Sequence, residues 1–319
     1  MRRLAILNDH ERQALALADW SAVAALCEIR VFDRPLTVPD EAARELQGVE
    51  IICLVRERTA VPVDLIARLP ALRFIAVTGP FHRTLDLSAA ARRGIAVSHT
   101  LPRDTAIHAT AELTWGLILS AARHIASSDR EMRIGNWPSG LGQGLRGRCL
   151  GLVGLGQISR RVALIGQAFS MEVIAWSQNL THEAAALVGV RRVERDELFA
   201  RSDVLSIHVV LSERTRGLVG ARELSQMKSS AILVNTSRGP VVDEQALVTA
   251  LTQGVIAAAG LDVFDQEPLA AMHPLRSLSN VVLTPHLGFS TKEIFRAYFE
   301  DTIDNVLAYL AGAPIRRLA

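Results

Sequence analysis

Residues 149–159, with the sequence Cys-Leu-Gly-Leu-Val-Gly-Leu-Gly-Gln-Ile-Ser, decide the fold of this chain. The apolar residues before Gly154 predict a buried strand, and the glycines at 154 and 156 predict a tight turn from which a helix begins. Such a turn binds the pyrophosphate of a dinucleotide, because backbone N–H groups at the helix N-terminus can approach the phosphates. Ser159 replaces the usual third glycine, and its small side chain still lets the helix pack on the strand. We expect contacts to the dinucleotide from Gly154, Gly156, Gln157 and Ile158.

Strand and helix patterns alternate along the chain on both sides of this motif. They predict five strands before it, at residues 4–9, 28–33, 51–55, 72–78 and 95–98. They predict six strands from the motif onward, at residues 149–154, 172–176, 204–210, 231–236, 256–263 and 281–285. One long helix is expected at about residues 105–135, and Asp40 and Asp64 are expected to cap helix starts. Alternation of this kind indicates an α/β fold with two doubly wound parallel sheets.

The two series of strands indicate two domains, which suits a length of 319 residues. The first series predicts one open parallel-sheet domain at residues 1–100, and the second, which starts at the glycine turn, predicts a dinucleotide-binding domain at residues 101–287. A last helix follows all the strands, and we expect residues 288–319 to return to the first domain. The second domain would then be inserted into the first, with hinges near residues 100 and 288 over a cleft.

The composition argues against several classes of function. Hydrophobic residues make up 49% of the chain and charged residues 21%, which is typical of a well-packed globular protein. A net charge of +2 without a run of five like charges gives no argument for nucleic-acid binding. Cys27, Cys53 and Cys149 lie far apart in apolar stretches, which indicates buried thiols in a reducing compartment and no metal site. No stretch has the length of a signal peptide or a membrane span, so we expect a soluble cytoplasmic protein.

Three polar residues follow the last three predicted strands. They are Arg238, a carboxylate in the stretch from Asp262 to Glu267, and His286, one after each strand. Open α/β sheets bind their ligands at the carboxyl ends of the strands, so these side chains are candidates for one site. Each residue alone is more often a solvated rim or loop residue, and only the joint spacing indicates a site.

Five motifs together make the chain similar to the D-isomer-specific 2-hydroxyacid dehydrogenase family, which includes phosphoglycerate dehydrogenases and glyoxylate/hydroxypyruvate reductases. They lie at residues 111–115, 151–159, 235–239, 262–268 and 285–288. The resemblance covers nearly the whole chain. It implies two α/β domains, a Rossmann-type NAD(P)-binding domain at residues 101–287 inserted into a flavodoxin-like substrate domain at residues 1–100 and 288–319. It also implies NAD or NADP as cofactor, a small 2-hydroxy or 2-keto acid as substrate, and a homodimer.

The chemistry of such a reaction fits the three strand-end residues. Reduction of a 2-keto acid needs a hydride on the carbonyl carbon and a proton on its oxygen, and His286 can supply the proton. The resemblance supplies Glu267 as the carboxylate that orients the histidine ring. Arg238 can hold the substrate carboxylate and polarise the carbonyl through its fork of donors. We therefore expect three catalytic residues, of which Arg238 and His286 also contact the substrate.

The resemblance also implies further cofactor contacts. Asp262 would receive the nicotinamide carboxamide, and the backbone at His208 and Val209 would line the adenosine side, with the His208 ring packed and not catalytic. The other expected contacts are Ser177, Thr236, Ser237 and Gly288. An NAD-preferring site usually has an acidic residue after the second strand, where this chain has Ser177-Gln178-Asn179. No arginine stands there to attract a 2′-phosphate, so NAD and NADP both stay open.

Loops of the first domain are expected to meet the substrate. Arg56 resembles a family residue at the distal end of the substrate, and a surface salt bridge is a nearly equal alternative. Gly79 and Pro80 occupy the loop whose backbone donors bind the substrate carboxylate in the family, although a proline lacks one donor. His82 and Arg83 could add contacts to a polar or anionic distal group.

Two alternative functions stay open from the sequence. Dinucleotide-sensing corepressors resemble these enzymes and can retain the three strand-end residues, but they carry a peptide groove and long disordered tails. This chain begins at its first predicted strand and stops just after its last predicted helix, which favours the enzyme. The second alternative is an enzyme of the same family for phosphorylated substrates, because Arg56 and Arg83 could bind a phosphate.

Overall fold

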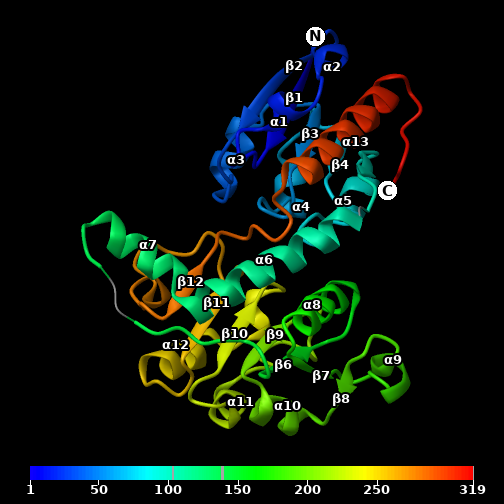
Figure 1. Cartoon of the computed structure of the whole chain (residues 1–319). Helices are drawn as coiled ribbons and strands as arrows, with labels where there is room; N and C mark the ends of the chain where they lie inside the picture. The colour runs from blue at the N-terminus through cyan, green and yellow to red at the C-terminus, as the bar shows by residue number, and fades with distance from the viewer. Residues whose placement is uncertain (103, 138–139, 319) are drawn as a thin grey trace. The chain divides into compact units, whose positions relative to one another are not determined.

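The computed structural model describes residues 1–102, 104–137 and 140–318. The chain divides into two compact units (Figure 1): unit 1 is Met1–Asp104 with Thr291–Ala319, and unit 2 is Thr105–Ser290. Each unit is built on one parallel sheet. The boundaries expected from the sequence were 100/101 and 287/288.

Unit 1 contains a five-stranded sheet with the order β2-β1-β3-β4-β5, which is the order of flavodoxin-like folds. Its strands are β1 (Arg2–Leu7), β2 (Cys27–Phe32), β3 (Ile51–Leu54), β4 (Phe74–Val77) and β5 (Ala96–His99). Each overlaps a predicted strand. All residues of β3 and β4 are buried, as expected for central parallel strands covered on both faces.

Six helices in the described part of unit 1 cover its sheet. They are α1 (Ala14–Leu17), α2 (Ser21–Ala24), α3 (Pro39–Glu45), α4 (Val63–Ala67), α5 (Leu87–Arg92) and α13 (Lys292–Leu310). The last of these comes from the end of the chain and packs against β4, β5, α1 and α2. Tyr309 of α13 stacks on Phe74 of β4 with ring centroids 4.5 Å apart. The predicted return of the last helix to the first sheet therefore has a packing reason, because its apolar face covers β4.

The predicted caps at Asp40 and Asp64 are wrong. The N-caps of α3 and α4 are Val38 and Pro62, two residues before the predicted ones, and neither aspartate makes a capping hydrogen bond. Both aspartates lie in the first helical turn, where their negative charge interacts favourably with the helix dipole and stabilises the helix.

Unit 2 contains a seven-stranded parallel sheet with the order β12-β11-β10-β9-β6-β7-β8. The strands are β6 (Cys149–Val153), β7 (Glu172–Trp176), β8 (Arg191–Arg192), β9 (Val204–Ile207), β10 (Ile232–Asn235), β11 (Ala258–Leu261) and β12 (Val281–Leu283). The chain adds β7 and β8 on one side of β6 and β9 to β12 on the other. This reversal next to β6 is where doubly wound sheets bind their ligands, so the glycine turn after β6 lies at the expected place.

Helices cover both faces of this sheet. They are α6 (Asp104–Arg123), α7 (Ile125–Arg133), α8 (Gln157–Ala168), α9 (His182–Ala186), α10 (Arg195–Arg201), α11 (Ala221–Gln226) and α12 (Glu244–Thr252), with the short 3-10 helices η1 (Gly239–Val241) and η2 (Pro274–Arg276). Leu150 and Leu152 of β6 pack with α6 and α8, while Cys149 and Val153 pack with α10 to α12. The alternation of β6 side chains between the two cores confirms a strand buried on both faces.

Two elements differ from the sequence-based expectation. The long helix expected at 105–135 is two helices, because His124 between α6 and α7 adopts a left-handed conformation with φ 56°. The two-residue strand β8 was missed, since it is too short to show a period. No helix in the described ranges is long and apolar enough to cross a membrane.

Candidate active site

The carboxyl ends of β10, β11 and β12 lie side by side in unit 2. β10 pairs with β11 and β11 with β12, each with the last residues of the strands in register. The loops that follow therefore leave the same edge of the sheet. These loops carry Arg238, Glu267 and His286.

His286 and Glu267 form a direct pair. Nδ1 of His286 lies 2.6 Å from Oε2 of Glu267, and Oε1 of Glu267 accepts the Phe264 N–H at 3.0 Å. A carboxylate only accepts hydrogen bonds, so Nδ1 is the nitrogen that carries a proton in the neutral ring. Among the described residues Nε2 of His286 has no hydrogen-bond partner, and the side chain is 30% exposed. The pair therefore leaves Nε2 available to a ligand.

The surroundings of Glu267 keep its carboxylate ionised. Burial alone would raise its pKa, but the hydrogen bond and charge of His286, the Phe264 N–H and the charge of Arg238 outweigh burial and lower the pKa of Glu267 below its usual value. Gly239, the neighbour of Arg238, packs against the backbone of Phe264 and Asp265, so the Arg238 loop touches the loop that carries Glu267. Unit 2 thus brings the three strand-end residues together.

Asn235, the last residue of β10, fixes the loop that carries Arg238. Its side-chain Oδ1 accepts the Ser237 N–H at 3.0 Å and the Ser237 hydroxyl at 2.8 Å, and its Nδ2 donates to the Arg238 carbonyl at 3.0 Å. This loop-fixing role of Asn235 was not predicted from the sequence. Its position at the end of an apolar strand could have indicated this role, because a buried polar residue there must find hydrogen-bond partners.

Gly239 brings the Arg238 loop against the loop that carries Glu267. A Cβ atom at this position would lie 2.0 Å from the Phe264 carbonyl carbon and 2.5 Å from the Asp265 nitrogen. No side chain fits there without separating the two loops. This packing role was also missed, because sequence alone does not show what lies opposite a glycine.

Asp262 holds the loop that carries His286. Its Oδ1 accepts the Thr284 hydroxyl at 2.6 Å and the Leu287 N–H at 2.7 Å, and its Oδ2 accepts the Gly288 N–H at 2.9 Å. Burial raises the pKa of Asp262 against the opposing effect of these donors. The contact to a nicotinamide carboxamide implied by the resemblance would add to this loop-holding role.

The turn after β6 fits a dinucleotide pyrophosphate. Gly154 has φ 93°, and a Cβ there would lie 2.7 Å from the His208 carbonyl oxygen, so the position accepts only glycine. Gly156 precedes α8 and has open space where a Cβ would stand, which leaves room for a phosphate at the helix N-terminus. Ser159 is buried and donates to the Gly156 carbonyl at 3.1 Å, so the third motif position packs as expected.

The other expected cofactor residues follow neighbouring strands at the same edge. Ser177 comes directly after β7, His208 and Val209 after β9, and Thr236 after β10. The His208 ring contacts the Ser206 hydroxyl at 2.9 Å, and burial lowers the pKa of His208 to about 4. A histidine that stays neutral in this way has the packed role expected of it. The Thr236 hydroxyl lies 2.9 Å from that of Thr114 on α6.

The end of β7 carries no carboxylate. Ser177 is followed by exposed Gln178 and Asn179, and a positive charge reaches the strand end from Arg195, the first residue of α10. The Arg195 guanidinium lies over the Trp176 ring, 5.7 Å from its centroid. The residues after the strand, 177–179, do not predict this positive charge, because Arg195 comes much later in the chain.

Unit 1 gathers its own candidate residues around Arg56. This residue has φ 60°, its N–H donates to the Thr78 hydroxyl at 2.7 Å, and its carbonyl accepts from His82 Nε2 at 3.0 Å. Its Nη1 lies 3.5 Å from the Tyr298 hydroxyl. Two side-chain bonds to one residue's backbone explain how a non-glycine residue keeps this left-handed conformation.

Two expectations for the loop after β4 need correction. His82 does not extend toward a ligand: it is buried, its ring holds the Arg56 carbonyl, and burial lowers its pKa. The Gly79 N–H is not an open donor either, because it already donates to the Thr100 hydroxyl at 2.8 Å. Pro80 has no N–H, so neither residue offers a free backbone donor, while Arg83 lies at the surface with its guanidinium over Phe81.

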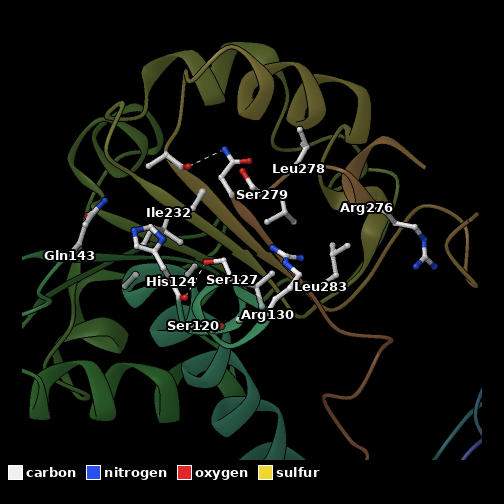
Figure 2. Close-up of a pocket in the computed structure, with 18 residues that line it drawn as sticks. Ser120, His124, Ser127, Arg130, Gln143, Ile232, Arg276, Leu278, Ser279 and Leu283 are labelled. Atoms are coloured by element: carbon white, nitrogen blue, oxygen red, sulfur yellow. Dashed lines mark hydrogen bonds between the residues drawn. The ribbon is translucent and has the colours of Figure 1, made fainter. Parts of the chain in front are cut away.

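A pocket of about 260 Å³ lies elsewhere in unit 2. Figure 2 shows residues of α7 and the turn before it on one side, among them Ser127 and Arg130, and Leu278 and Ser279 on the other. It runs along the edge strand β12 and is lined by none of the expected site residues. The candidate site is therefore defined by the strand ends and not by this pocket.

Comparison with known proteins agrees with this arrangement. The family profile described as "D-isomer specific 2-hydroxyacid dehydrogenase, NAD binding domain" matches residues 115–288. The glyoxylate reductase of Aeropyrum pernix is 40% identical over 298 residues, which are 89% of this chain and 87% of that protein. The D-3-phosphoglycerate dehydrogenase of Archaeoglobus fulgidus is 37% identical over 87% of this chain, but over only 52% of its own length. The crystal structure of a putative D-3-phosphoglycerate dehydrogenase from Ralstonia solanacearum superimposes with a TM-score of 0.92 at 33% identity, covering 100% of this chain and 97% of that one.

The three similar proteins are matched over both units and the family profile over unit 2, and nothing in these matches supports the corepressor-like alternative. The cofactor is NAD or NADP. The chain belongs to the D-isomer-specific 2-hydroxyacid dehydrogenase family and is an NAD(P)-dependent oxidoreductase that interconverts a D-2-hydroxy acid and its 2-keto acid.

Proposed function

We propose that the chain reduces short 2-keto acids, with glyoxylate and hydroxypyruvate as its substrates. The alignment with a glyoxylate reductase is both higher in identity and more complete for the relative than the alignment with a phosphoglycerate dehydrogenase. The more complete match to a glyoxylate reductase favours a short, unphosphorylated acid as the substrate. The phosphorylated substrate becomes the competing outcome of the test below.

In this proposal Arg238 binds the substrate carboxylate and the carbonyl oxygen through its planar fork of donors. When bound, the nicotinamide ring supplies or accepts the hydride. His286 donates a proton from Nε2 to the carbonyl oxygen as negative charge develops there, and Glu267 fixes the ring and stabilises its charged form. In the oxidation direction His286 accepts the hydroxyl proton. The 2.6 Å contact between Nδ1 and Glu267 carries the proposal, because it leaves Nε2 as the reactive nitrogen.

We also propose the cofactor contacts along the carboxyl edge of unit 2. The glycine-only backbone at residue 154 and the open space at residue 156 support a pyrophosphate there. The lack of a carboxylate at 177–179 removes repulsion against a 2′-phosphate, so both cofactors fit. The proposed contacts are Gly154, Gly156, Gln157, Ile158, Ser177, His208, Val209, Thr236, Ser237, Asp262 and Gly288.

Arg56 is the proposed substrate contact of unit 1, with Gly79 and Pro80 shaping the loop beside it. A Cβ at Gly79 would lie 2.9 Å from Arg56 Nη1, so the glycine makes room for the guanidinium. Hydroxypyruvate carries a distal hydroxyl and glyoxylate has none. Arg56→Gln is therefore expected to raise the KM for hydroxypyruvate and to leave that for glyoxylate unchanged.

A homodimer completes the proposal. Helix α7 has no buried residue, and it and the chain after it expose five large apolar side chains. We call this surface the α7 face: Ile125, Met132, Ile134, Trp137 and Leu141. A helix of nine residues with no buried residue gains stability by packing on another surface, and the family resemblance favours a second copy. Sedimentation should give a dimer for the wild type and a monomer for the doubly charged variant Trp137→Glu, Leu141→Glu.

A substrate panel tests the reaction. Glyoxylate, hydroxypyruvate, pyruvate, phenylpyruvate and phosphohydroxypyruvate are each reduced with NADH and with NADPH, and kcat/KM is measured from the loss of absorbance at the nicotinamide band. The two short acids should give the highest kcat/KM. Preference for phosphohydroxypyruvate would instead make the chain an enzyme for phosphorylated acids.

A further inference from the structure

Glu244 bridges two points of the segment between β11 and β12. It is the first residue of α12, and its Oε1 lies 3.0 Å from His273 Nε2. Its Oε2 accepts the Asp265 N–H at 3.3 Å. Glu244 and His273 are each only 20% exposed. One carboxylate therefore ties α12 to the same segment that carries Glu267.

His273 uses both of its ring nitrogens. Nε2 faces Glu244, and Nδ1 accepts the Leu275 N–H at 3.3 Å at the start of η2. An accepting Nδ1 carries no proton, so the neutral ring is the Nε2–H tautomer. Leu275 is 1% exposed and belongs to the core that packs under α12. The pair anchors η2 and leaves no ring nitrogen for chemistry.

The Asp265 N–H lies next to the contact that orients the proposed acid–base pair. The preceding N–H, that of Phe264, donates to Glu267 Oε1, while Glu267 Oε2 faces His286. The backbone of the same two residues packs against Gly239 of the Arg238 loop. Any rotation of the Phe264–Asp265 backbone would move the donor to Glu267 and the surface that supports Arg238.

We propose that Glu244 and His273 are positioning residues for the His286–Glu267 pair. Glu244 holds the Asp265 N–H, which fixes the backbone that orients Glu267, and His273 holds Glu244 in place. The inference rests on the proposed function of His286 and Glu267. Neither Glu244 nor His273 touches the substrate in this account, so their effect is on the chemical step and not on binding.

Glu244→Gln tests the proposal with little change of size. The amide keeps one accepting oxygen and turns the other into a donor, so either Asp265 or His273 loses its partner. We expect kcat for keto-acid reduction to fall on the order of 10-fold, because a small misplacement of an acid–base group lowers the rate steeply. The KM for the keto acid and the KM for the cofactor should stay unchanged. In ¹⁵N spectra of the histidine rings, His286 should change from one Nδ1–H tautomer to a mixture, its signal identified by its loss in His286→Ala.

Asp203→Asn is the matched control. Asp203 is also a buried carboxylate of unit 2 that accepts a backbone N–H, that of Cys149 at 2.8 Å, and pairs with a cation, Lys228 at 2.9 Å. It lies at the amino ends of β6 and β9, away from the strand-end site. It should lower the Tm and leave kcat and the His286 spectrum unchanged.

Three results would overturn the positioning role: wild-type kcat in Glu244→Gln, a loss of kcat without a change in the His286 spectrum, or the same spectral change in Asp203→Asn. If Glu244→Gln does not fold, His273→Gln serves instead, with a smaller loss of kcat expected because its amide can still donate to Glu244. If the wild type reduces no keto acid, the proposed function fails. The ring spectra still decide whether Glu244 orients His286.

Discussion

Unit 2 holds two histidine–glutamate pairs of similar geometry and different use. His286 Nδ1 lies 2.6 Å from Glu267, and His273 Nε2 lies 3.0 Å from Glu244. The second ring nitrogen separates them. His273 Nδ1 accepts a backbone N–H, whereas His286 Nε2 has no partner in the described part of the chain. A histidine with one engaged and one open nitrogen can transfer a proton, and one with both engaged can only hold structure.

The two pairs meet at one stretch of backbone. Phe264 donates to the glutamate of the first pair and Asp265 to the glutamate of the second. The stretch follows β11 directly, so a rigid parallel strand fixes its start. A fixed backbone at Phe264 and Asp265 therefore orients both glutamates at once. Side chains positioned by strand ends are held more firmly than side chains on a free loop.

The largest difference is expected between two alanine variants. His286→Ala removes the proposed proton donor and should lower kcat for keto-acid reduction about 10³-fold, since acid–base groups contribute on that order. His273→Ala should lower kcat by about tenfold or less, because it acts only through the position of Glu267. Steady-state kinetics and cofactor titration by fluorescence would measure both, with cofactor affinity retained in each.

Equal losses in the two variants would break the distinction between an open and a fully engaged histidine. Imidazole added to the medium gives a further control. It can enter the space left by His286→Ala and restore part of the turnover as a proton donor, but it should not rescue His273→Ala.

A second, smaller effect is expected at Gly239. Gly239→Ala must separate the Arg238 loop from Phe264, since its Cβ would lie 2.0 Å from the Phe264 carbonyl carbon. Displacing Arg238 relative to His286 should lower kcat/KM on the order of 100-fold. Gly116→Ala is the control, because this glycine lies within α6 with nothing within 4 Å of a Cβ. Wild-type kinetics in Gly239→Ala would show that the two loops need not touch.

Much of the fold was predictable from the sequence. All the predicted strands overlap observed ones, because continuous apolar runs between turn residues mark buried parallel strands. The break at His124 was not predictable, since no glycine or proline marks it and the amphipathic pattern continues through it. The caps at Asp40 and Asp64 failed for a different reason, because a two-residue shift of the helix start is within the uncertainty of any such pattern.

The polar residues of the candidate site could be predicted from the sequence, but the residues that hold them in position could not. Arg238, Glu267 and His286 carry the chemistry in recognisable motifs, so sequence and resemblance find them. Asn235, Gly239 and Glu244 act through contacts between segments far apart in the chain, which no local pattern contains. His82 shows the reverse error: a loop position suggested exposure, and tertiary packing buried the ring.

The third and smallest effect concerns acid pH. The pKa of Glu267 is lowered in the folded protein, where burial is outweighed by the His286 hydrogen bond, the charges of His286 and Arg238 and the Phe264 N–H. A carboxylate with a lowered pKa stabilises the fold above its unfolded pKa, and this stability is lost as pH falls through the folded value. On the acid side keto-acid reduction should follow the same sign, with kcat/KM falling about tenfold per pH unit below the folded pKa of Glu267.

Two variants use this fall of kcat/KM at low pH, the acid limb of the pH profile, to distinguish the roles of the two glutamates. The Glu267→Gln side chain cannot titrate, so the remaining activity of this variant should show no acid limb. Glu244→Gln should keep the acid limb and move it to higher pH, because the hydrogen bonds to Glu267 weaken. Initial rates between pH 3.5 and 6, with circular dichroism to verify that the protein stays folded, measure both. An acid limb that survives unchanged in Glu267→Gln would assign it to another group and remove Glu267 from the reaction, and with it the reason for treating the two glutamates differently.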